Sequence, residues 1–471
     1  MKRIVSTLIA FLMLVMTMNS LTFAAEGVDV QITDALGNKQ MTIENMKHKH
    51  IKSVTAINEV FGDGQKVSAV AVEYDSAIDT SKLKASDFTV EDKNVTKVYA
   101  NTAAEKAYKG VNGQYVIVEL DTTITPDTGY GGGNGASNDA NGAGNGQNGN
   151  AEQGASQGGN RPPGNGGPTL GFVATDSAES KPLTVNVTQS GDIATVGGQT
   201  YKADSKVMTN SKDINLVVDD FKKLVYTDPN YNNEKLMYNL YVPKNYDPSK
   251  KYPLVLFMHD AGVVSNNPTN TLTQGLGAVV WAEPSEQAKN ECFVLAPQYT
   301  SIIADDTSQT TEQMDITVDL VKDLEKQYSI DSNRLYNTGQ SMGGMTSIAM
   351  EIKYPDMFAA SLLVACQWDV NKVTPMVKKN LWIVVSEGDN KANPGMDSIT
   401  EALKKQGATV SKATWSAESS AAEFATDVSN MLAAGSNIYY TVFKNGNHRY
   451  TWQYAYTIEG VRDWLFKQVK Q

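Results

Sequence analysis

Two hydrophobic patterns divide this chain of 471 residues. Between about residues 26 and 215, apolar and polar positions alternate in short runs such as VSAVAVEYD (67–75), QYVIVELD (114–121) and PLTVNVTQ (182–189). Alternation with a period of two, bounded by Gly, Asp and Asn, is typical of strands that bury one face. We therefore expect residues 26–215 to form an all-β sandwich domain.

A Gly- and Asn-rich segment, residues 128–168, interrupts this β pattern. It is almost devoid of apolar side chains, so it cannot bury enough surface to offset the entropy lost on ordering. Because alternating strands resume at PLTVNVTQ, we interpret the segment as a disordered insertion within one sandwich. A linker between two smaller β units is the alternative.

From about residue 216 the pattern changes to continuous apolar runs: KYPLVLFMHDAG, ECFVLAPQY, RLYNTGQSMGG, FAASLLVACQWD, NLWIVVSEGD and NIYYTVFKNGNH. Runs of this kind are typical of strands buried on both faces. Helical stretches separate them; in TEQMDITVDLVKDLEKQYSI, apolar residues recur every four positions, at Ile316, Leu320, Leu324 and Tyr328. We expect an α/β domain over residues 216–471, with a mostly parallel sheet covered by helices on both sides.

Residues 1–25 have the layout of a secretory signal peptide: Lys2 and Arg3, an apolar run from Ile4 to Met18, and small residues ending at Ala25. The apolar run is shorter than the roughly 20 residues that span a bilayer, which disfavours the alternative, a membrane anchor. No later segment of the sequence approaches that length. We expect a secreted, extracellular protein whose mature chain does not insert into a membrane.

The charge balance indicates which partners are unfavourable, and the positions of the cysteines indicate whether they form disulfides. The chain has 41 Lys and Arg against 52 Asp and Glu, a formal net charge of −11. Such an acidic protein is a poor partner for nucleic acid or an anionic membrane. Cys292 and Cys366 both lie in apolar stretches, so we expect two buried thiols rather than a disulfide scaffold.

One serine between glycines, Ser341 in NTGQSMGGM, is the first candidate for chemistry. A GxSxG match alone is weak, since a small residue in a tight turn gives the same letters. Its context is more specific, because the apolar strand Arg334–Thr338 precedes it and the helical stretch GGMTSIAMEIKY follows it. A sharp strand-to-helix turn exposes the serine hydroxyl, and flanking glycines let the helix approach the strand. We interpret Ser341 as a nucleophile.

A serine hydroxyl needs a base that accepts its proton. The chain has four histidines: His48 and His50 lie in the β region, and His259 directly follows the strand PLVLFM. Only His448 lies downstream of Ser341, in the loop KNGNHRY after the strand IYYTVF, so we expect it to be the base. We expect His259 to order its own loop.

A carboxylate should orient the base and stabilise its protonated form. Two carboxylates follow the strand LWIVVS: Asp389 lies deeper in the loop, where it can turn toward the base, and Glu387 is the alternative. The oxyanion that develops during acyl transfer needs N–H donors. We expect one donor from the amide of Met342, at the start of the helix, and one from the amide of Ala261, in the loop after PLVLFM.

Six stretches of the second region carry a further signal: YNLYVPKNYDPSKKYPLVLFMHDAG, LTQGLGAVVWAEPSEQAKNECFVLAPQY, DSNRLYNTGQSMGGMTS, YPDMFAASLLVACQ, LWIVVSEGDN and NGNHRYTWQYAY. Over residues 216–471 the chain resembles secreted bacterial α/β-hydrolase esterases that carry an immunoglobulin-like domain before the catalytic domain, a group similar to feruloyl and acetyl esterases and to prolyl oligopeptidase-related hydrolases. The resemblance is looser over the β region, where VEYDSAIDTSKLKASDFTVED and GQYVIVELD carry it. It implies an α/β-hydrolase fold after an immunoglobulin-like sandwich, with Ser341 as nucleophile, Asp389 as acid and His448 as base.

The resemblance also implies a substrate class. It points to carboxylic esters with short acyl or aromatic groups, such as feruloyl or acetyl esters of plant polysaccharides, hydrolysed without a metal or an organic cofactor. Trp368 and Trp452 follow strand ends, where they could form an aromatic wall of the substrate pocket. The alternative is that both tryptophans pack in the core.

One residue departs from the family pattern, because Asp260 follows His259 where relatives usually have glycine. A carboxylate near an oxyanion opposes its negative charge unless the carboxylate points away. Two other functions stay open: a serine peptidase of the same fold, and a catalytically inert surface binding or adhesion protein, which Asp260 favours.

Overall fold

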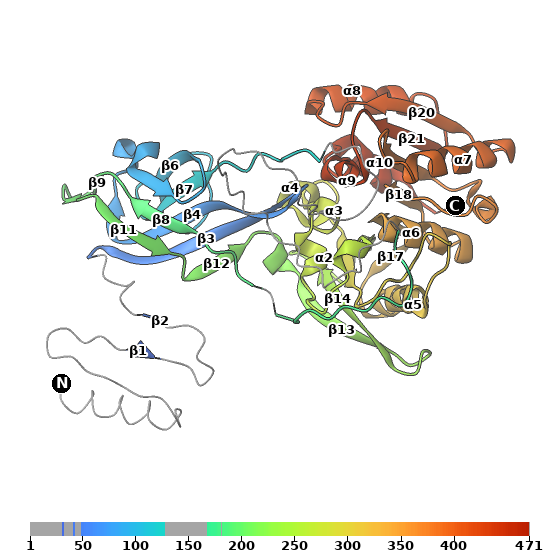
Figure 1. Cartoon of the computed structure of the whole chain (residues 1–471), viewed down its shortest axis with the longest axis horizontal. Helices are drawn as coiled ribbons and strands as arrows, with labels where there is room; N and C mark the ends of the chain where they lie inside the picture. The colour runs from blue at the N-terminus through green and yellow to red at the C-terminus, as the bar shows by residue number, and fades with distance from the viewer. Residues whose placement is uncertain (1–30, 33–40, 43–48, 128–166, 180, 471) are drawn as a thin grey trace, which may run out of the picture. The chain divides into compact units, whose positions relative to one another are not determined.

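The computed structural model describes residues 31–32, 41–42, 49–127, 167–179 and 181–470. The expected signal peptide and most of the Gly- and Asn-rich segment lie outside these residues. The chain forms two compact units (Figure 1). The first takes in the chain up to Ile57, then Val67–Asp121 and Leu183–Ile214, and the second takes in Asn58–Lys66, Thr122–Pro182 and Asn215–Gln471.

The first unit is a sandwich of two antiparallel sheets with a shared apolar core. The larger sheet has the order β12-β3-β4-β7-β6, with β3 Ile51–Phe61, β4 Gly64–Ile78, β6 Val95–Asn101, β7 Gly113–Leu120 and β12 Lys212–Asn215. The smaller has the order β11-β8-β5, with β5 Phe88–Val90, β8 Asn186–Gln189 and β11 Asp204–Thr209. Two short antiparallel pairs form separate two-stranded sheets: β1 Gln31–Ile32 with β2 Met41–Thr42, and β9 Ile193–Ala194 with β10 Thr200–Tyr201.

The alternating residues of these strands face the core between the two sheets, as the period-two pattern predicts. Val70 and Val72 of β4 share that core with Val187 of β8. Strand β8 follows the Gly- and Asn-rich segment in the chain, yet it pairs antiparallel with β5, which precedes that segment. Strands from both sides of residues 128–166 therefore belong to one sandwich, and its fold is the predicted immunoglobulin-like one.

The second unit contains one sheet of nine strands in the order β13-β14-β16-β15-β17-β18-β19-β21-β20. The first two pairings, β13–β14 and β14–β16, are antiparallel, and the others are parallel. The strands are β13 Lys222–Asp228, β14 Glu234–Tyr241, β15 Tyr252–Met258, β16 Phe293–Gln298, β17 Ile330–Gln340, β18 Ala360–Val364, β19 Leu381–Ser386, β20 Val410–Trp415 and β21 Ile438–Phe443. The predicted continuous apolar runs form the central strands, which confirms the predicted α/β class.

Helices cover both faces of this sheet (Figure 1). One face packs against α5 Glu312–Gln327, α6 Met342–Lys353 and α7 Ala392–Lys405. The other packs against α2 Asn270–Thr273, α3 Leu276–Val279, α8 Ala421–Leu432, α9 His448–Ala455 and α10 Glu459–Lys467, and the short α4 Pro284–Gln287 precedes β16. Two apolar cores result, one on each side of the sheet, and together they hold the strands rigidly in register.

The parallel strands place their C-terminal ends at one edge of the sheet. Strand β15 ends at Met258, β17 at Gln340, β19 at Ser386 and β21 at Phe443. The residues that follow these ends come together although they lie far apart in the sequence, and this edge is where open α/β sheets bind ligands. The fold therefore brings the loops after these four strands to one place.

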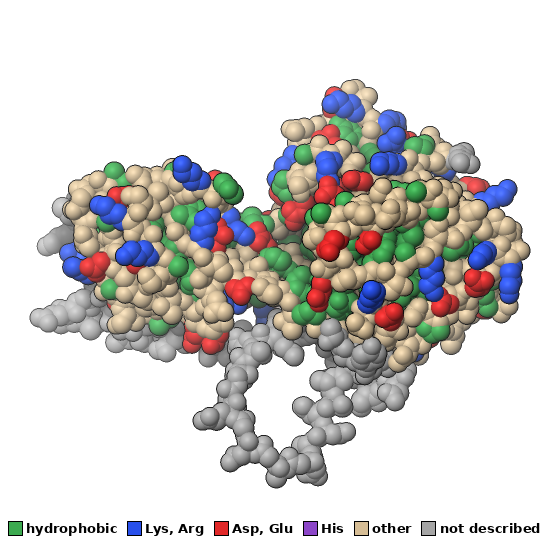
Figure 2. Space-filling view, turned by 90° about the horizontal axis from the view of Figure 1, so that it is seen from above, with side chains coloured by type: hydrophobic (Ala, Val, Ile, Leu, Met, Phe, Trp, Pro, Cys, Tyr) green, Lys and Arg blue, Asp and Glu red, His purple; other side chains and the backbone are tan. Residues whose placement is uncertain are grey.

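Three further features of the described residues concern surface charge, the two cysteines and the length of the helices. On the face shown in Figure 2, basic and acidic side chains are interspersed. Cys292, before β16, and Cys366, after β18, are both buried and unpaired, as predicted. Within the described part of the chain, the helices are too short or too polar to cross a bilayer.

Candidate active site

Ser341 lies in a strained turn between β17 and α6. Its backbone has φ of +52° and ψ of −117°, in a region that L-residues other than glycine rarely occupy and that costs about 1–3 kcal/mol. Gly343 is required here, because a Cβ at this position would lie 1.9 Å from the carbonyl oxygen of Met258. Gly339 is equally confined, since its Cβ would meet the backbone of Gly343 at 2.4 Å. The glycines of the motif thus allow α6 to pack directly on β15 and β17.

A chain of hydrogen bonds connects three of the predicted residues. The Oγ of Ser341 lies 2.9 Å from Nε2 of His448. Nδ1 of the same imidazole lies 2.5 Å from Oδ2 of Asp389. The side chain of His448 is 34% exposed and that of Asp389 only 3%, so the imidazole can reach solvent while its carboxylate partner cannot. The structure therefore brings together Ser341, Asp389 and His448, the three residues predicted from chain order.

Asp389 is held as an anion by several donors. Burial of its carboxyl opposes ionisation, but the hydrogen bond and the electrostatic interaction with His448, together with the amides of Ala392 and Lys391, hold the pKa of Asp389 below its usual range. The two amides donate to Oδ1 at 2.9 and 3.2 Å, which leaves Oδ2 for the imidazole. The alternative carboxylate, Glu387, is exposed and accepts from the amide of Asn445 at 3.0 Å.

His448 is the first residue of helix α9, whereas the sequence suggested a loop. The helix begins here because Asn447 acts as its N-cap, with Oδ1 accepting from the amide of Tyr450 at 3.0 Å. About one turn further on, the ring of Trp452 packs edge-on against the imidazole, with ring centroids 5.0 Å apart. His448 therefore stands at the start of a capped helix and is supported by an aromatic ring.

The loop after β15 forms a short 3₁₀ turn, η5 (Ala261–Val263), beside the serine. Asp260 caps it: Oδ1 accepts from the amide of Gly262 at 2.8 Å, and Oδ2 accepts from Nε2 of Gln340 at 3.1 Å. With φ of −74° and ψ of 166°, Asp260 has extended backbone that needs no glycine. The carboxylate of Asp260 thus accepts from two donors and orders the loop. Sequence reasoning missed Gln340, because nothing in its neighbourhood marks its partner.

His259 is fully buried and locked in a single neutral form. Nδ1 donates to the carbonyl oxygen of Asp260 at 2.8 Å, and Nε2 accepts from the amide of Tyr299 at 3.0 Å. Burial lowers the pKa of His259, with the contacts to Asp260 acting in the opposite direction. The imidazole has no free nitrogen for proton transfer, so it orders the loop, as we expected.

The two amides predicted to bind an oxyanion lie at the starts of adjacent turns. Met342 is the first residue of α6 and Ala261 the first of η5. Amides in the first turn of a helix have no acceptor within that helix. The two turns are close, because a Cβ on Gly343 would lie 3.0 Å from the carbonyl oxygen of His259. Donors of this kind at the serine are what an oxyanion would need.

The two predicted substrate-binding tryptophans are mostly buried. Trp368 is 9% exposed and packs in the core that contains α5 to α7, and Trp452 is 7% exposed and packs in the opposite core. Each can offer only a small part of its ring to a ligand. Their role in binding substrate stays a prediction.

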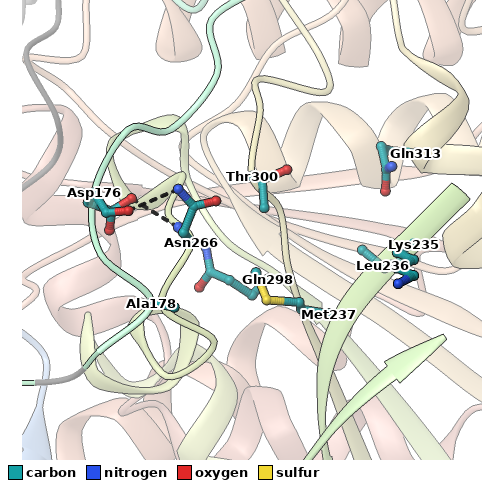
Figure 3. A pocket seen from close by; sticks show the side chains of 9 residues that line it. All are labelled: Asp176, Ala178, Lys235, Leu236, Met237, Asn266, Gln298, Thr300 and Gln313. Atoms are coloured by element: carbon teal, nitrogen blue, oxygen red, sulfur yellow. Dashed lines mark hydrogen bonds between the residues drawn. The ribbon is translucent and has the colours of Figure 1, made fainter.

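A separate cavity of about 580 Å³ lies near the edge of the sheet that carries β14 (Figure 3). A segment that returns from the Gly- and Asn-rich region forms one wall, where Asp176 accepts from the amide of Asn266 at 2.9 Å and from the hydroxyl of Ser265. The remaining walls come from β14, β16 and α5, and include Met237, Gln298 and Gln313. Ser341, Asp389 and His448 are not among the residues that line this cavity.

Two family models match the chain. The family described as "Esterase Ig-like N-terminal domain" matches residues 53–202, and the family described as "Putative esterase" matches residues 230–459. No curated protein sequence is matched.

Solved structures are also similar to this chain. The structure of a thermostable esterase is 26% identical, covers 89% of this chain and 100% of its own, and has a TM-score of 0.67. A feruloyl esterase module from Clostridium thermocellum is 17% identical, with 53% of this chain and 89% of that one covered and a TM-score of 0.38. An acylaminoacyl peptidase is 13% identical, with 64% and 50% covered and a TM-score of 0.37. Scores as low as these last two say nothing about activity.

The family matches fall on both parts of the chain, and the match with the thermostable esterase extends over both. The chain belongs to the esterases that carry an N-terminal immunoglobulin-like domain, and it is a carboxylic ester hydrolase of the α/β-hydrolase fold.

Proposed function

We propose that the protein is a serine esterase that works through an acyl-enzyme intermediate. His448 removes the proton of Ser341 as Oγ attacks the ester carbonyl carbon, which gives a tetrahedral intermediate. The protonated His448 then donates that proton to the leaving alcohol as the carbon–oxygen bond of the ester breaks. In the second half of the reaction, His448 takes a proton from a water molecule as the water oxygen attacks the acyl carbon. His448 then returns this proton to Oγ of Ser341 as the bond between Oγ and the acyl carbon breaks.

The remaining groups stabilise charge. Asp389 is already ionised and buried, so it stabilises the imidazolium and keeps the tautomer in which Nε2 faces Ser341. The amides of Met342 and Ala261 donate to the oxyanion. Loss of one such donor lowers the rate of an acyl-transfer enzyme about 10²- to 10³-fold. The observation that carries the proposal is the unbroken hydrogen-bond chain from Ser341 Oγ through His448 to Asp389.

For the substrate we propose esters with short acyl or aromatic groups, including acetyl and feruloyl esters of polysaccharides. We further propose that the enzyme is secreted and acts on them outside the cell. The exposed third of the His448 side chain supports access by a bulky, polymer-linked ester. The segment at residues 1–25 supports export. An ester preference over peptides is checked by giving the enzyme matched ester and amide substrates at equal concentration.

The test compares wild type with Ser341→Ala. The variant should keep its circular dichroism spectrum and lose turnover of a chromogenic acetate ester and labelling by a fluorophosphonate. Ser347→Ala is the matched control, because this serine lies on the same helix and its Oγ donates only within α6, to the carbonyl of Gly343 at 3.0 Å. Turnover by Ser341→Ala at the wild-type rate would exclude the mechanism. A panel of aryl, acetyl-sugar and feruloyl esters then ranks the substrates.

A further inference from the structure

Helix α9, which begins at the proposed base, is bound at both ends by a short segment of the second unit, residues 122–127. At the start of the helix, Nδ2 of Asn447 donates to the carboxylate of Asp127. In its last turn, Oε1 of Gln453 accepts from the amide of Asp127 at 2.9 Å, and Nε2 of Gln453 donates to the carbonyl of Thr125 at 3.3 Å. The segment therefore holds both ends of α9.

Asn447 connects this segment to the base. Its Oδ1 caps α9 by accepting from the amide of Tyr450, and its Nδ2 donates to Asp127. Since both side-chain groups are used, the asparagine cannot turn without losing one hydrogen bond. On the other side of the base, Nε of Arg449 lies 4.0 Å from Oδ2 of Asp127. Asp127 thus contacts both sequence neighbours of His448.

The segment is itself supported, so Asp127 does not lie on a free end. The amide of Thr125 donates to Oδ2 of Asp63 at 3.3 Å, and Nζ of Lys66 donates to the carbonyl of Thr123 at 3.2 Å. Lys66 and Asp63 form an ion pair at 2.6 Å. The backbone before Asp127 is therefore attached to residues 63–66 as well as to α9.

We propose that Asp127 is a positioning residue for His448, an inference that rests on the proposed function. Asp127 fixes Asn447, and Asn447 caps the helix whose first residue carries the imidazole between Ser341 and Asp389. Small displacements of a base lower the rate strongly, because proton transfer needs aligned donors and acceptors. Asp127 acts through the helix rather than on the ester, so its loss should lower kcat and leave KM nearly unchanged.

The experiment measures kcat and KM on a chromogenic acetate ester, and the rate at which a fluorophosphonate labels Ser341. For Asp127→Ala we expect kcat and the labelling rate to fall about tenfold, with KM changed less than about twofold. Asp127→Asn keeps an oxygen that accepts from Asn447, so it should restore kcat to within about threefold of wild type. Asp356→Ala, the same change at an exposed aspartate after α6, is the control and should match wild type.

A second variant keeps the test valid if Asp127→Ala fails to fold. Asn447→Ser retains a good N-cap but removes the donor to Asp127, so it too should lower kcat and labelling. Wild-type rates in the variants, or a change in KM alone, would overturn the positioning role. A wild-type enzyme that neither turns over esters nor labels at Ser341 would instead defeat the proposed function on which this role depends.

Discussion

Replacing Glu351 with Gln should remove a pH-dependent loss of stability from the catalytic domain. Glu351 is a fully buried carboxyl on α6, the helix that follows the serine. Its Oε1 accepts from the hydroxyl of Ser361 at 2.5 Å, while Oε2 has no hydrogen-bond partner among the described residues. The ammonium of Lys379 stops 4.0 Å away. Burial raises the pKa of Glu351 from 4.5 to about 7, against the opposing effects of Ser361 and Lys379.

The sign and size of the pH effect on stability follow from the difference between the ordinary and the raised pKa of Glu351. Between pH 4.5 and 7 the folded protein keeps the proton on Glu351 while the unfolded chain releases it, so stability is full below this window and falls as pH rises through it. Each pKa unit corresponds to about 1.4 kcal/mol, so the loss is on the order of 3 kcal/mol. Gln keeps the acceptor for Ser361 and cannot ionise. The free energy of unfolding of Glu351→Gln, relative to that of wild type, should therefore rise by about 3 kcal/mol between pH 4.5 and pH 8.

Urea unfolding followed by tryptophan fluorescence measures this gain, because the six tryptophans of the chain, from Trp281 to Trp464, all lie in the second unit. Wild type and Glu351→Gln are compared at pH 4.5, 6 and 8. Glu401→Gln, the same change at an exposed position of α7, is the control for nonspecific effects. Parallel curves for wild type and Glu351→Gln across this range would refute the reasoning.

Three further predictions concern the site. Asp389→Asn should lower kcat by about 10³- to 10⁴-fold, because an amide cannot stabilise an imidazolium; initial rates on a chromogenic ester check this, and a loss under tenfold would contradict it. Gly343→Ala should destabilise by about 3 kcal/mol or more, because its Cβ would lie 1.9 Å from the carbonyl oxygen of Met258; a melting curve like that of wild type would exclude this contact. Asp260→Leu should lower kcat about tenfold, whereas Asp260→Asn, which still accepts from Gly262, should be nearly normal. Equal rates in both would exclude the capping role.

The fold was predictable where burial follows a period in the sequence. The central strands of the second unit are continuous apolar runs, and the sandwich strands alternate, so both architectures could be expected. The edge hairpin β13–β14 was not anticipated. In β13 only Asp228 is buried, so no apolar run marks the strand, and its pairing with β14 is what makes it a strand.

The grouping of Ser341, Asp389 and His448 was predictable because chain order and a single downstream histidine restrict the choice of residues. The contacts of single loop residues were not, because they follow no period. Asn447 and Asp127 are 320 residues apart, and Gln340 and Asp260 are 80 apart. A helix at His448 was also missed, since its cap consists of one asparagine in a sequence rich in turn residues. Folding alone brings these partners together.

The buried thiols give this enzyme an internal reporter of its own fluctuations. Cys366 packs under the first turn of α6, where a Cβ on Gly344 would lie 2.7 Å from its Sγ, and burial raises the pKa of the Cys366 thiol. A thiol reagent in solution can therefore react there only while the helix behind the serine is lifted from the sheet. The kinetics of its alkylation, compared with those of Cys292, would show how often the turn at Ser341 opens while the rest of the molecule stays folded.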